Sequence, residues 1–313
     1  MSIIEFDKIL SDFIDIPGCL YNCLKYYLSP EGTQLFEKAA SEVESFNIRK
    51  VFFIGHSYNY FASFVPFYYL NSLFRKSHPS SKQIECIAFE MDEFLNYYKP
   101  TKHLEESLFC FISQSGNSVQ LKQSVEILLN HNIEKKYIWG VSNNERSFLD
   151  EVSEICFHNQ TGPEEMYGIK TYSNTILVLY FISRILSGEK PITQKIETDI
   201  RNLIFEVKFY GTDWDSHTQS ITEFLGEDYE FLYFISKGTS LSTAHQAAQS
   251  CKAYARTFGA GMELGLFMRG PFQMVDDNFR CVLVVSDEVA MEDTLEAIDL
   301  ITNKMGSGKV VLI

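Results

Sequence analysis

Serine, glutamine and glycine gather in one short stretch of this chain, residues 113–118, which read Ser-Gln-Ser-Gly-Asn-Ser. Their hydroxyl and amide groups donate hydrogen bonds without carrying charge, which suits the binding of a phosphate or another anion. Gly116 lets the backbone come close to a ligand. These residue types predict an anion-binding turn; the alternative is a serine-rich helix cap with a structural role only.

The residues on either side predict how this turn is held. Residues 107–112 form an apolar run typical of a buried strand, and apolar residues recur at helical spacing between Val119 and Leu129. A helix that begins directly after the turn leaves its first amides without acceptors and adds partial positive charge there. The order strand, turn, helix therefore predicts a phosphate site that needs no lysine.

The turn also resembles a known signature, S-Q-S-G-[ED]-[ST], of the sugar isomerase (SIS) family of phosphosugar-binding domains. Members include the isomerase half of glucosamine-6-phosphate synthase and the fructosamine-6-phosphate deglycases. The resemblance implies that Ser113, Gln114, Ser115 and Ser118 contact the phosphate and the sugar. Asn117 stands where the family usually has an acidic residue, which removes a charge near the sugar.

A second turn follows another predicted strand, Val51-Phe-Phe-Ile54, and reads Gly55-His56-Ser57. It resembles the G-x-S turn after the family's first strand, which implies that Ser57 contacts the ligand. The alternative for Ser57 is a helix cap, and His56 is either a sugar contact or a structural residue. Since ligands of α/β proteins bind at the carboxyl ends of parallel strands, the two turns predict one shared site.

The chain as a whole predicts an α/β fold, because apolar strand patterns alternate with helical ones. After the strands at 51–54 and 107–112, further strands are predicted at 84–89, 136–141 and 152–157, and the pattern restarts with strands at 231–235, 281–285 and 310–313. We therefore expect two similar SIS-type halves, each a parallel sheet flanked by helices in a flavodoxin-like three-layer arrangement. The expected organisation is a helical segment at 1–30, a first SIS domain at 31–190, a helical connection at 191–226 and a second, C-terminally shortened SIS domain at 227–313.

The pattern of apolar residues also predicts several helices and their boundaries. Pro17-Gly18 is expected to interrupt the first helix, aromatic residues cover a helix at 59–75, and helices are predicted over 164–186 and 241–258. For Glu164 and Glu165, we favour a role in complementing the positive end of a helix dipole over a role in catalysis. Lys170 and Thr171 fall near a T-K pattern of the family.

The second half departs from the family where catalysis is concerned. In the isomerases and deglycases, a glutamate base and a histidine before a Gly-Pro pair perform proton transfer, whereas here Arg269 precedes Gly270-Pro271. Residues 238–262 contain no aspartate or glutamate, so Glu263 is the nearest candidate base. His245 is a second catalytic candidate, with a packed or surface histidine as its alternative. Arg269 stays protonated, which suits an anion ligand better than a proton shuttle.

Composition excludes several function classes. The net charge of −14 disfavours nucleic acid and anionic membrane as partners. The N-terminus lacks the basic region of a signal peptide, and the longest apolar run, 176–182, is too short to span a bilayer. Seven scattered cysteines without a C-x-x-C pair indicate reduced core residues of a cytoplasmic protein. We expect no metal and no nucleotide cofactor.

The sequence thus predicts a phosphosugar-binding protein and leaves two function classes open. One is an enzyme, either an aldose–ketose isomerase or a deglycase or deaminase acting on a 6-phosphorylated amino sugar. The other is a non-catalytic phosphosugar sensor or regulator, which the missing base and histidine favour. Because the family's site commonly lies at a subunit contact, the resemblance also implies a homodimer.

Overall fold

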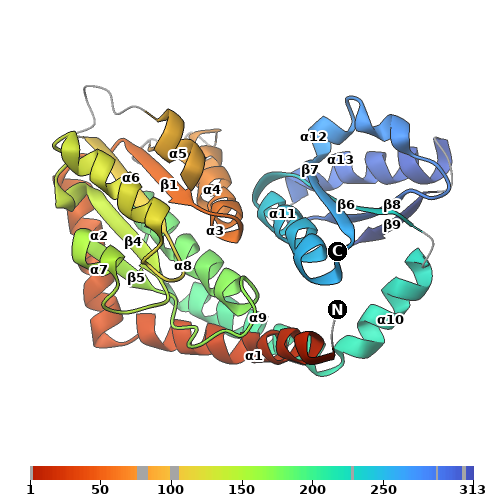
Figure 1. Ribbon diagram of the computed structural model, residues 1–313, viewed down its shortest axis with the longest axis horizontal. Coiled ribbons are helices and arrows are strands. Elements are labelled where there is room, and N and C mark those ends of the chain that lie inside the picture. Colours follow the sequence, from red (N-terminus) through yellow and green to blue (C-terminus); the bar gives the residue numbers. More distant parts are fainter. Residues whose placement is uncertain (1–2, 76–83, 99–105, 227–228, 287, 305–307) are drawn as a thin grey trace. The chain divides into compact units, whose positions relative to one another are not determined.

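A computed structural model describes residues 3–75, 84–98, 106–226, 229–286, 288–304 and 308–313 (Figure 1). The chain divides into two compact units, Asp7–Phe209 and Tyr210–Ile313 with the first six residues. We call them the N-terminal and the C-terminal unit and describe each by itself. Residues 1–2 and 227–228, where two of the expected domains begin, lie outside the described residues.

The N-terminal unit is built on a five-stranded parallel sheet with the strand order β2-β1-β3-β4-β5. Gly55 at the end of β1 pairs with Glu90 of β2 and Ile112 of β3, so these strands end at one common edge. The turns that follow β1 and β3 are therefore neighbours, as the sequence predicts. The strands are β1 (Lys50–Gly55), β2 (Glu85–Glu90), β3 (Ser107–Ile112), β4 (Ile138–Ser142) and β5 (Ile155–His158).

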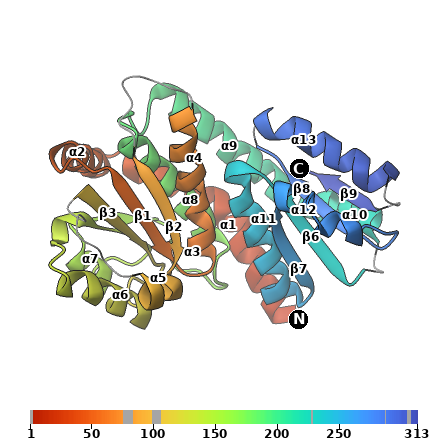
Figure 2. The same cartoon turned by 90° about the horizontal axis from the view of Figure 1, so that it is seen from above.

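Helices cover both faces of this sheet and make three layers (Figure 2). Alternate residues of β3 face opposite cores: Leu108 and Cys110 join one buried cluster, and Phe109 and Phe111 join the other. The first cluster packs against α1 (Ile3–Tyr27), α2 (Pro30–Ser45), α3 (Tyr58–Ala62), α4 (Phe64–Arg75), α8 (Lys170–Leu186) and α9 (Gln194–Thr212). The second packs against α5 (Met91–Tyr97), α6 (Val119–Asn130) and α7 (Phe148–Val152).

The C-terminal unit repeats this plan with a four-stranded parallel sheet in the order β7-β6-β8-β9. Its central strand β6 lies between β7 and β8, as β1 lies between β2 and β3, so the predicted duplication of the α/β pattern is confirmed. The strands are β6 (Phe231–Ser236), β7 (Phe258–Glu263), β8 (Arg280–Val284) and β9 (Lys309–Leu312). The helices are α10 (Trp214–Leu225), α11 (Leu241–Ser250), α12 (Leu264–Phe267) and α13 (Glu288–Asp299).

Three helix predictions were wrong. Helix α1 runs through Pro17 without interruption, because Leu20 and Leu24 on its buried side hold it against the core. Helix α8 begins at Lys170 rather than at residue 164, since the carboxylate of Glu164 accepts hydrogen bonds from the first amides of the helix. The helix predicted at 241–258 ends in a π-helical turn at Cys251–Ala255, and a strand, β7, follows from Phe258.

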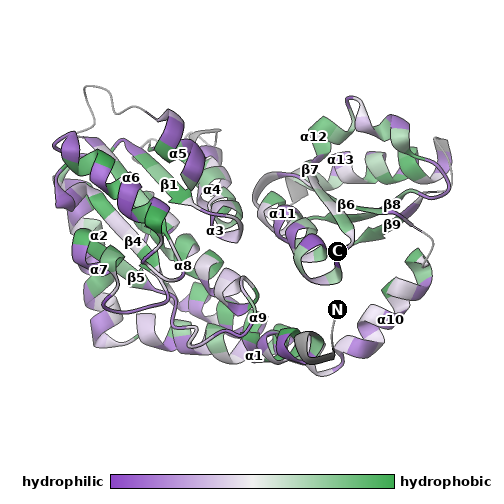
Figure 3. Cartoon of the chain, viewed as in Figure 1, coloured by the Kyte–Doolittle hydropathy of each residue, from purple (hydrophilic) through white to green (hydrophobic). Residues whose placement is uncertain are grey.

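The hydropathy of the chain follows its layers, with apolar strands between helices of mixed character (Figure 3). The core is rich in aromatic side chains: Phe53, Phe109, Phe157 and Phe181 are fully buried. Tyr58 of α3 is buried, and most of the other described aromatic side chains of α3 and α4 are half-buried rather than exposed. Within the part of the chain that the structure describes, no helix combines the length and the hydrophobicity needed to cross a membrane.

Candidate functional site

The loop after β3 forms a compact turn that hydrogen bonds largely to itself. The backbone amide of Gly116 donates to the carbonyl and the hydroxyl oxygens of Ser113, both at 3.2 Å. The hydroxyl oxygen of Ser115 accepts from the amide of Asn117 at 3.2 Å. Ser118 ends the turn in an extended conformation, and its hydroxyl oxygen caps α6 by accepting from the amide of Leu121 at 3.3 Å. The predicted order of strand, turn and helix is confirmed.

Several backbone amides of this turn make no hydrogen bond within the described part of the chain. Among the described residues, the backbone amides of Ser115, Ser118, Val119 and Gln120 have no hydrogen-bond acceptor. Unsatisfied amides at a helix N-terminus, together with the helix dipole, attract an anion. We call residues 113–120 the nest, and it is the strongest candidate for a phosphate site.

The first residues of helix α7 hydrogen bond to the nest. The amide of Phe148 donates to the side-chain oxygen of Asn117 at 3.0 Å, and the amide of Leu149 donates to the carbonyl of Gly116 at 3.0 Å. Gly116 has a φ of 63°, and a Cβ atom at this position would lie 2.6 Å from the Cβ of Ser147. Asn117 therefore supports the loop through α7, where the family's acidic residue would carry a charge.

Gln114 is fixed by a network that sequence reasoning missed. The hydroxyl of Tyr58 donates to its side-chain oxygen at 3.0 Å, and its amide nitrogen donates to Glu164 at 2.9 Å and to the hydroxyl of Thr171 at 3.4 Å. These partners come from α3, the loop after β5 and the start of α8. Their long sequence separation explains why no local pattern indicates the network.

Glu164 is the hub of this network. Its carboxylate accepts from the amides of Ile169 at 3.0 Å and Thr171 at 2.9 Å, and from the Thr171 hydroxyl at 2.7 Å. Glu164 complements the N-terminus of α8 as predicted, although the helix begins later than expected. Glu164 thereby aligns both Gln114 and the start of α8.

Lys170, near the family's T-K pattern, is buried and bonds to α1. Its Nζ lies 2.8 Å from a carboxylate oxygen of Asp15 and 3.4 Å from one of Asp12. The hydrogen bond from Lys170 lowers the pKa of Asp15 below its usual value. Asp12 also accepts from the amides of Glu165 and Met166. Lys170 therefore anchors the loop before α8 to α1.

Ser57 stands in an unusual backbone conformation, with φ of 51° and ψ of −125°. Ser57 occupies the N-cap position of α3, but its exposed side chain makes no capping hydrogen bond to that helix. Strained residues of this kind persist at ligand sites more often than elsewhere. The next residue back, His56, bonds through Nδ1 to Glu90 of β2 at 2.5 Å.

The remaining candidates lie in the C-terminal unit. Glu263 is the last residue of β7 and pairs with Ser236, so it stands at the carboxyl edge of the second sheet as Glu90 does in the first. It precedes α12 but its side chain makes no capping bond to that helix. Burial lowers the pKa of His245, and the negative charge of Glu263 partly opposes this shift. Arg269 is exposed and follows α12.

Comparison with known proteins agrees with the fold. No protein-family model matches the chain. A glutamine–fructose-6-phosphate aminotransferase of Sulfurisphaera tokodaii is 24% identical over 259 residues, which are 82% of this chain and 39% of that protein. The corresponding enzyme of Thermococcus kodakarensis is 20% identical over 260 residues, 80% of this chain and 40% of its own length. The chain thus spans about two fifths of the length of these two relatives.

Solved structures share the architecture over nearly the whole chain. The C-terminal domain of the aminotransferase from Francisella tularensis covers 97% of this chain and 82% of its own, with a TM-score of 0.73 and 20% identity. The chain therefore shares the two-sheet α/β fold of these phosphosugar proteins, as the resemblance to SIS domains implies. A tagatose-6-phosphate ketose/aldose isomerase of Escherichia coli aligns with a TM-score of 0.73 and 14% identity, over 97% of this chain and 80% of its own. A glucosamine-6-phosphate deaminase of Thermotoga maritima aligns with a TM-score of 0.69 and 17% identity, over 98% of this chain and 84% of its own.

Proposed function

We propose that this chain is an SIS-domain protein that binds a phosphorylated sugar or amino sugar, with the phosphate in the nest of residues 113–120. The observation that carries the proposal is the set of backbone amides in the turn and at the start of α6 that have no acceptor among the described residues. The hydroxyls of Ser113, Ser115 and Ser118 stand on the same turn and add donors. The aminotransferases, isomerase and deaminase that share the fold all carry a phosphosugar in their names, which supports this ligand class.

Ser57 and Gln114 complete the proposed ligand site in different ways. Ser57 is exposed on the turn next to the nest, so its hydroxyl is a candidate sugar contact. Gln114 is held in place by hydrogen bonds with Tyr58 and Glu164. We therefore assign it both a structural role beneath the ligand and a direct contact to it. We further assign Arg269 as an anion ligand, on the grounds of its charge and exposure.

The proposed reaction is aldose–ketose isomerisation, or the deglycation or deamination of a 6-phosphorylated amino sugar. Such a reaction moves a proton between neighbouring sugar carbons, which needs a base close to the carbon. Glu263 supplies a carboxylate at a strand end, and burial favours a neutral His245 that can exchange a proton. The second candidate is a phosphosugar sensor without catalysis, which the absence of acidic residues between 238 and 262 favours.

Replacing Ser115 with alanine tests the nest. We expect the affinity for fructose-6-phosphate or glucosamine-6-phosphate to fall roughly ten- to a hundredfold, because a hydrogen bond to a charged group contributes about 1.5–3 kcal/mol. Isothermal titration of both sugars against wild type and Ser115→Ala measures this. Ser41→Ala, on the exposed side of α2, is the matched control and should bind as wild type does. Equal affinities for all three folded proteins would remove the phosphate assignment.

We also propose that the protein is a cytoplasmic homodimer. Its seven cysteines are unpaired, as expected of a reducing compartment. Phe13 and Ile14 of α1 and Leu203 and Phe205 of α9 are exposed large apolar residues, and we assign them to the contact between the two copies.

Light scattering tests the assembly. We expect a mass of about twice that of the 36.1 kDa chain at micromolar concentration, and a shift toward the monomer for Phe205→Asp, because a charge would be buried in an apolar contact. Tyr97→Asp is the control, since Tyr97 is equally exposed but lies on α5. A wild-type mass near 36.1 kDa would refute the dimer.

A further inference from the structure

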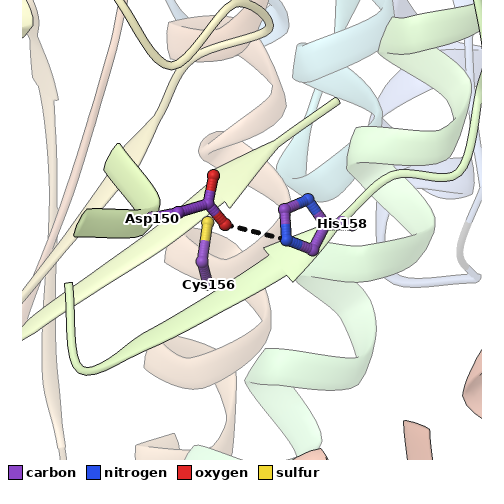
Figure 4. Close-up of side chains that lie close together, drawn as sticks. All are labelled: Asp150, Cys156 and His158. Atoms are coloured by element: carbon purple, nitrogen blue, oxygen red, sulfur yellow. Dashed lines mark ion pairs between the residues drawn. The ribbon is translucent and has the colours of Figure 1, made fainter. Parts of the chain in front are cut away.

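Three metal-ligating side chains meet beside β5, outside the proposed sugar site. Asp150, Cys156 and His158 bring a carboxylate oxygen, a thiol sulfur and an imidazole nitrogen within 4.8 Å of one another. Cys156 and His158 are alternate residues of β5 and so share one face of the strand. Figure 4 shows both side chains directed toward Asp150, which comes from the preceding helix α7.

The carboxylate at the centre of this cluster is held in place. One oxygen of Asp150 lies 2.9 Å from Nε2 of His158, and the other accepts from the amide and the hydroxyl of Ser147 at 2.9 and 2.6 Å. Outer hydrogen bonds of this kind orient a ligating carboxylate. The second imidazole nitrogen, Nδ1, is buried and has no partner among the described residues. Because a carboxylate only accepts hydrogen bonds, the contact with Asp150 places the ring proton on Nε2. A metal bound at Nε2 would take the place of this hydrogen bond, and the ring proton would then sit on Nδ1.

The cluster does not have the arrangement of a nucleophilic cysteine. Burial and the nearby charge of Asp150 raise the pKa of the Cys156 thiol well above its usual value. An activated thiol needs the opposite shift, from a neighbouring base or positive charge. Metal binding differs, because the ion itself displaces the thiol proton.

We propose that Asp150, Cys156 and His158 form a zinc-binding site. One sulfur, one nitrogen and one oxygen donor match the ligand preference of Zn²⁺, and tetrahedral coordination at about 2.0–2.3 Å requires donors about 3.3–3.8 Å apart. The observed spacing needs only small side-chain movements to reach it. His158 also lines a cavity of about 960 Å³. Zinc sites with three protein ligands commonly take water as the fourth.

The zinc site shares no residue with the nest, and a bound ion would stabilise the nest indirectly. A bound ion joins β5 to α7, and α7 holds Gly116 and Asn117 through the amides of Leu149 and Phe148. The sequence expectation of no metal site rested on the absence of a recognised cysteine spacing. Here the third ligand comes from a neighbouring helix, and only the fold brings it close.

Cobalt(II) titration of the metal-stripped full-length chain tests the site. We expect one equivalent to bind with a thiolate-to-cobalt charge-transfer absorption, which zinc then abolishes by displacement. Cys156→Ser keeps a hydrogen bond to Asp150 but removes the sulfur, so the absorption should vanish. His158→Gln should weaken cobalt binding by more than about tenfold. Zinc should also raise the melting temperature of wild type and leave that of Cys156→Ser unchanged.

Two controls separate this site from others. Cys251→Ser removes a half-buried thiol of the C-terminal unit and should keep the full absorption. His56→Ala removes a histidine that lies with Glu90 and Asp92 in a cluster without sulfur, and it should also keep the absorption. No charge-transfer absorption in wild type, or unchanged absorption in Cys156→Ser, would overturn the proposal. If Cys156→Ser does not fold, unchanged cobalt affinity of His158→Gln overturns it instead.

Discussion

Replacing Gly116 with alanine should abolish phosphosugar binding and destabilise the N-terminal unit by about 2–5 kcal/mol. The left-handed conformation at φ of 63° costs an alanine about 1–2 kcal/mol. Overpacking adds about 1–3 kcal/mol, because the new Cβ would lie 2.6 Å from the Cβ of Ser147. Ser147 cannot turn away easily, since its amide and hydroxyl both bond to Asp150. The loop must shift instead, and this shift moves the amides of the proposed phosphate site out of position.

Substitution of a second glycine, Gly188, distinguishes the cost of backbone strain from the cost of overpacking. Gly188 has a φ of 78° at the end of α8, and a Cβ there meets nothing within 4 Å. Gly188→Ala should therefore cost only the backbone strain and leave the affinity for fructose-6-phosphate unchanged. Urea unfolding gives the stability of each variant, and calorimetric titration gives its affinity. If both variants lose the same stability and both still bind the sugar, the close packing of Gly116 on α7 does not control the nest.

The sequence predicted the nest because all its determinants are local. The strand before it is a run of apolar residues, and the turn residues follow directly, so one window contains strand, donors and helix start. The edge shared with Ser57 also follows from sequence, since strands alternating with helices imply a parallel sheet. The pairing of Gly55 with Ile112 confirms that edge.

Strand β7 was missed because its residues fit a strand poorly. Gly259 and Gly261 have low strand propensity, and the helical pattern before them continues without a clear stop. In the fold both glycines are needed, because a Cβ at Gly259 would lie 2.8 Å from the carbonyl of Ala248 and one at Gly261 2.8 Å from the Cα of His245. Close packing of α11 on the strand, a tertiary effect, outweighs local propensity.

The partners of Gln114 show a second limit. Tyr58 and Glu164 are 56 and 50 residues away in the chain, and Thr171 is 57 residues away. Each of these residues has an ordinary local role as a helix residue or loop acid. Only the common edge of the sheet brings them together, so the network becomes visible with the fold.

Replacing Glu263 with glutamine should lower turnover by about 10²–10⁴-fold if the protein is an enzyme, because a positioned base contributes that factor. Affinity for the phosphosugar should stay nearly unchanged, since the phosphate is held by the nest. The residue is exposed, ends β7 and makes no capping bond to α12, so glutamine should fit without loss of stability. Wild type is first assayed with fructosamine-6-phosphates and hexose-6-phosphates, and each variant is then compared by kcat and by kcat/KM.

Glu296→Gln is the matched control, because Glu296 is an exposed carboxylate on α13 of the same unit. It should turn over substrate at the wild-type rate, which would show that the loss belongs to Glu263 and not to a change of net charge. Equal rates for wild type and Glu263→Gln would make the base assignment wrong while leaving phosphosugar binding untouched. If wild type binds these sugars and converts none of them, the sensor interpretation is favoured, because the carboxylate then has no proton to move.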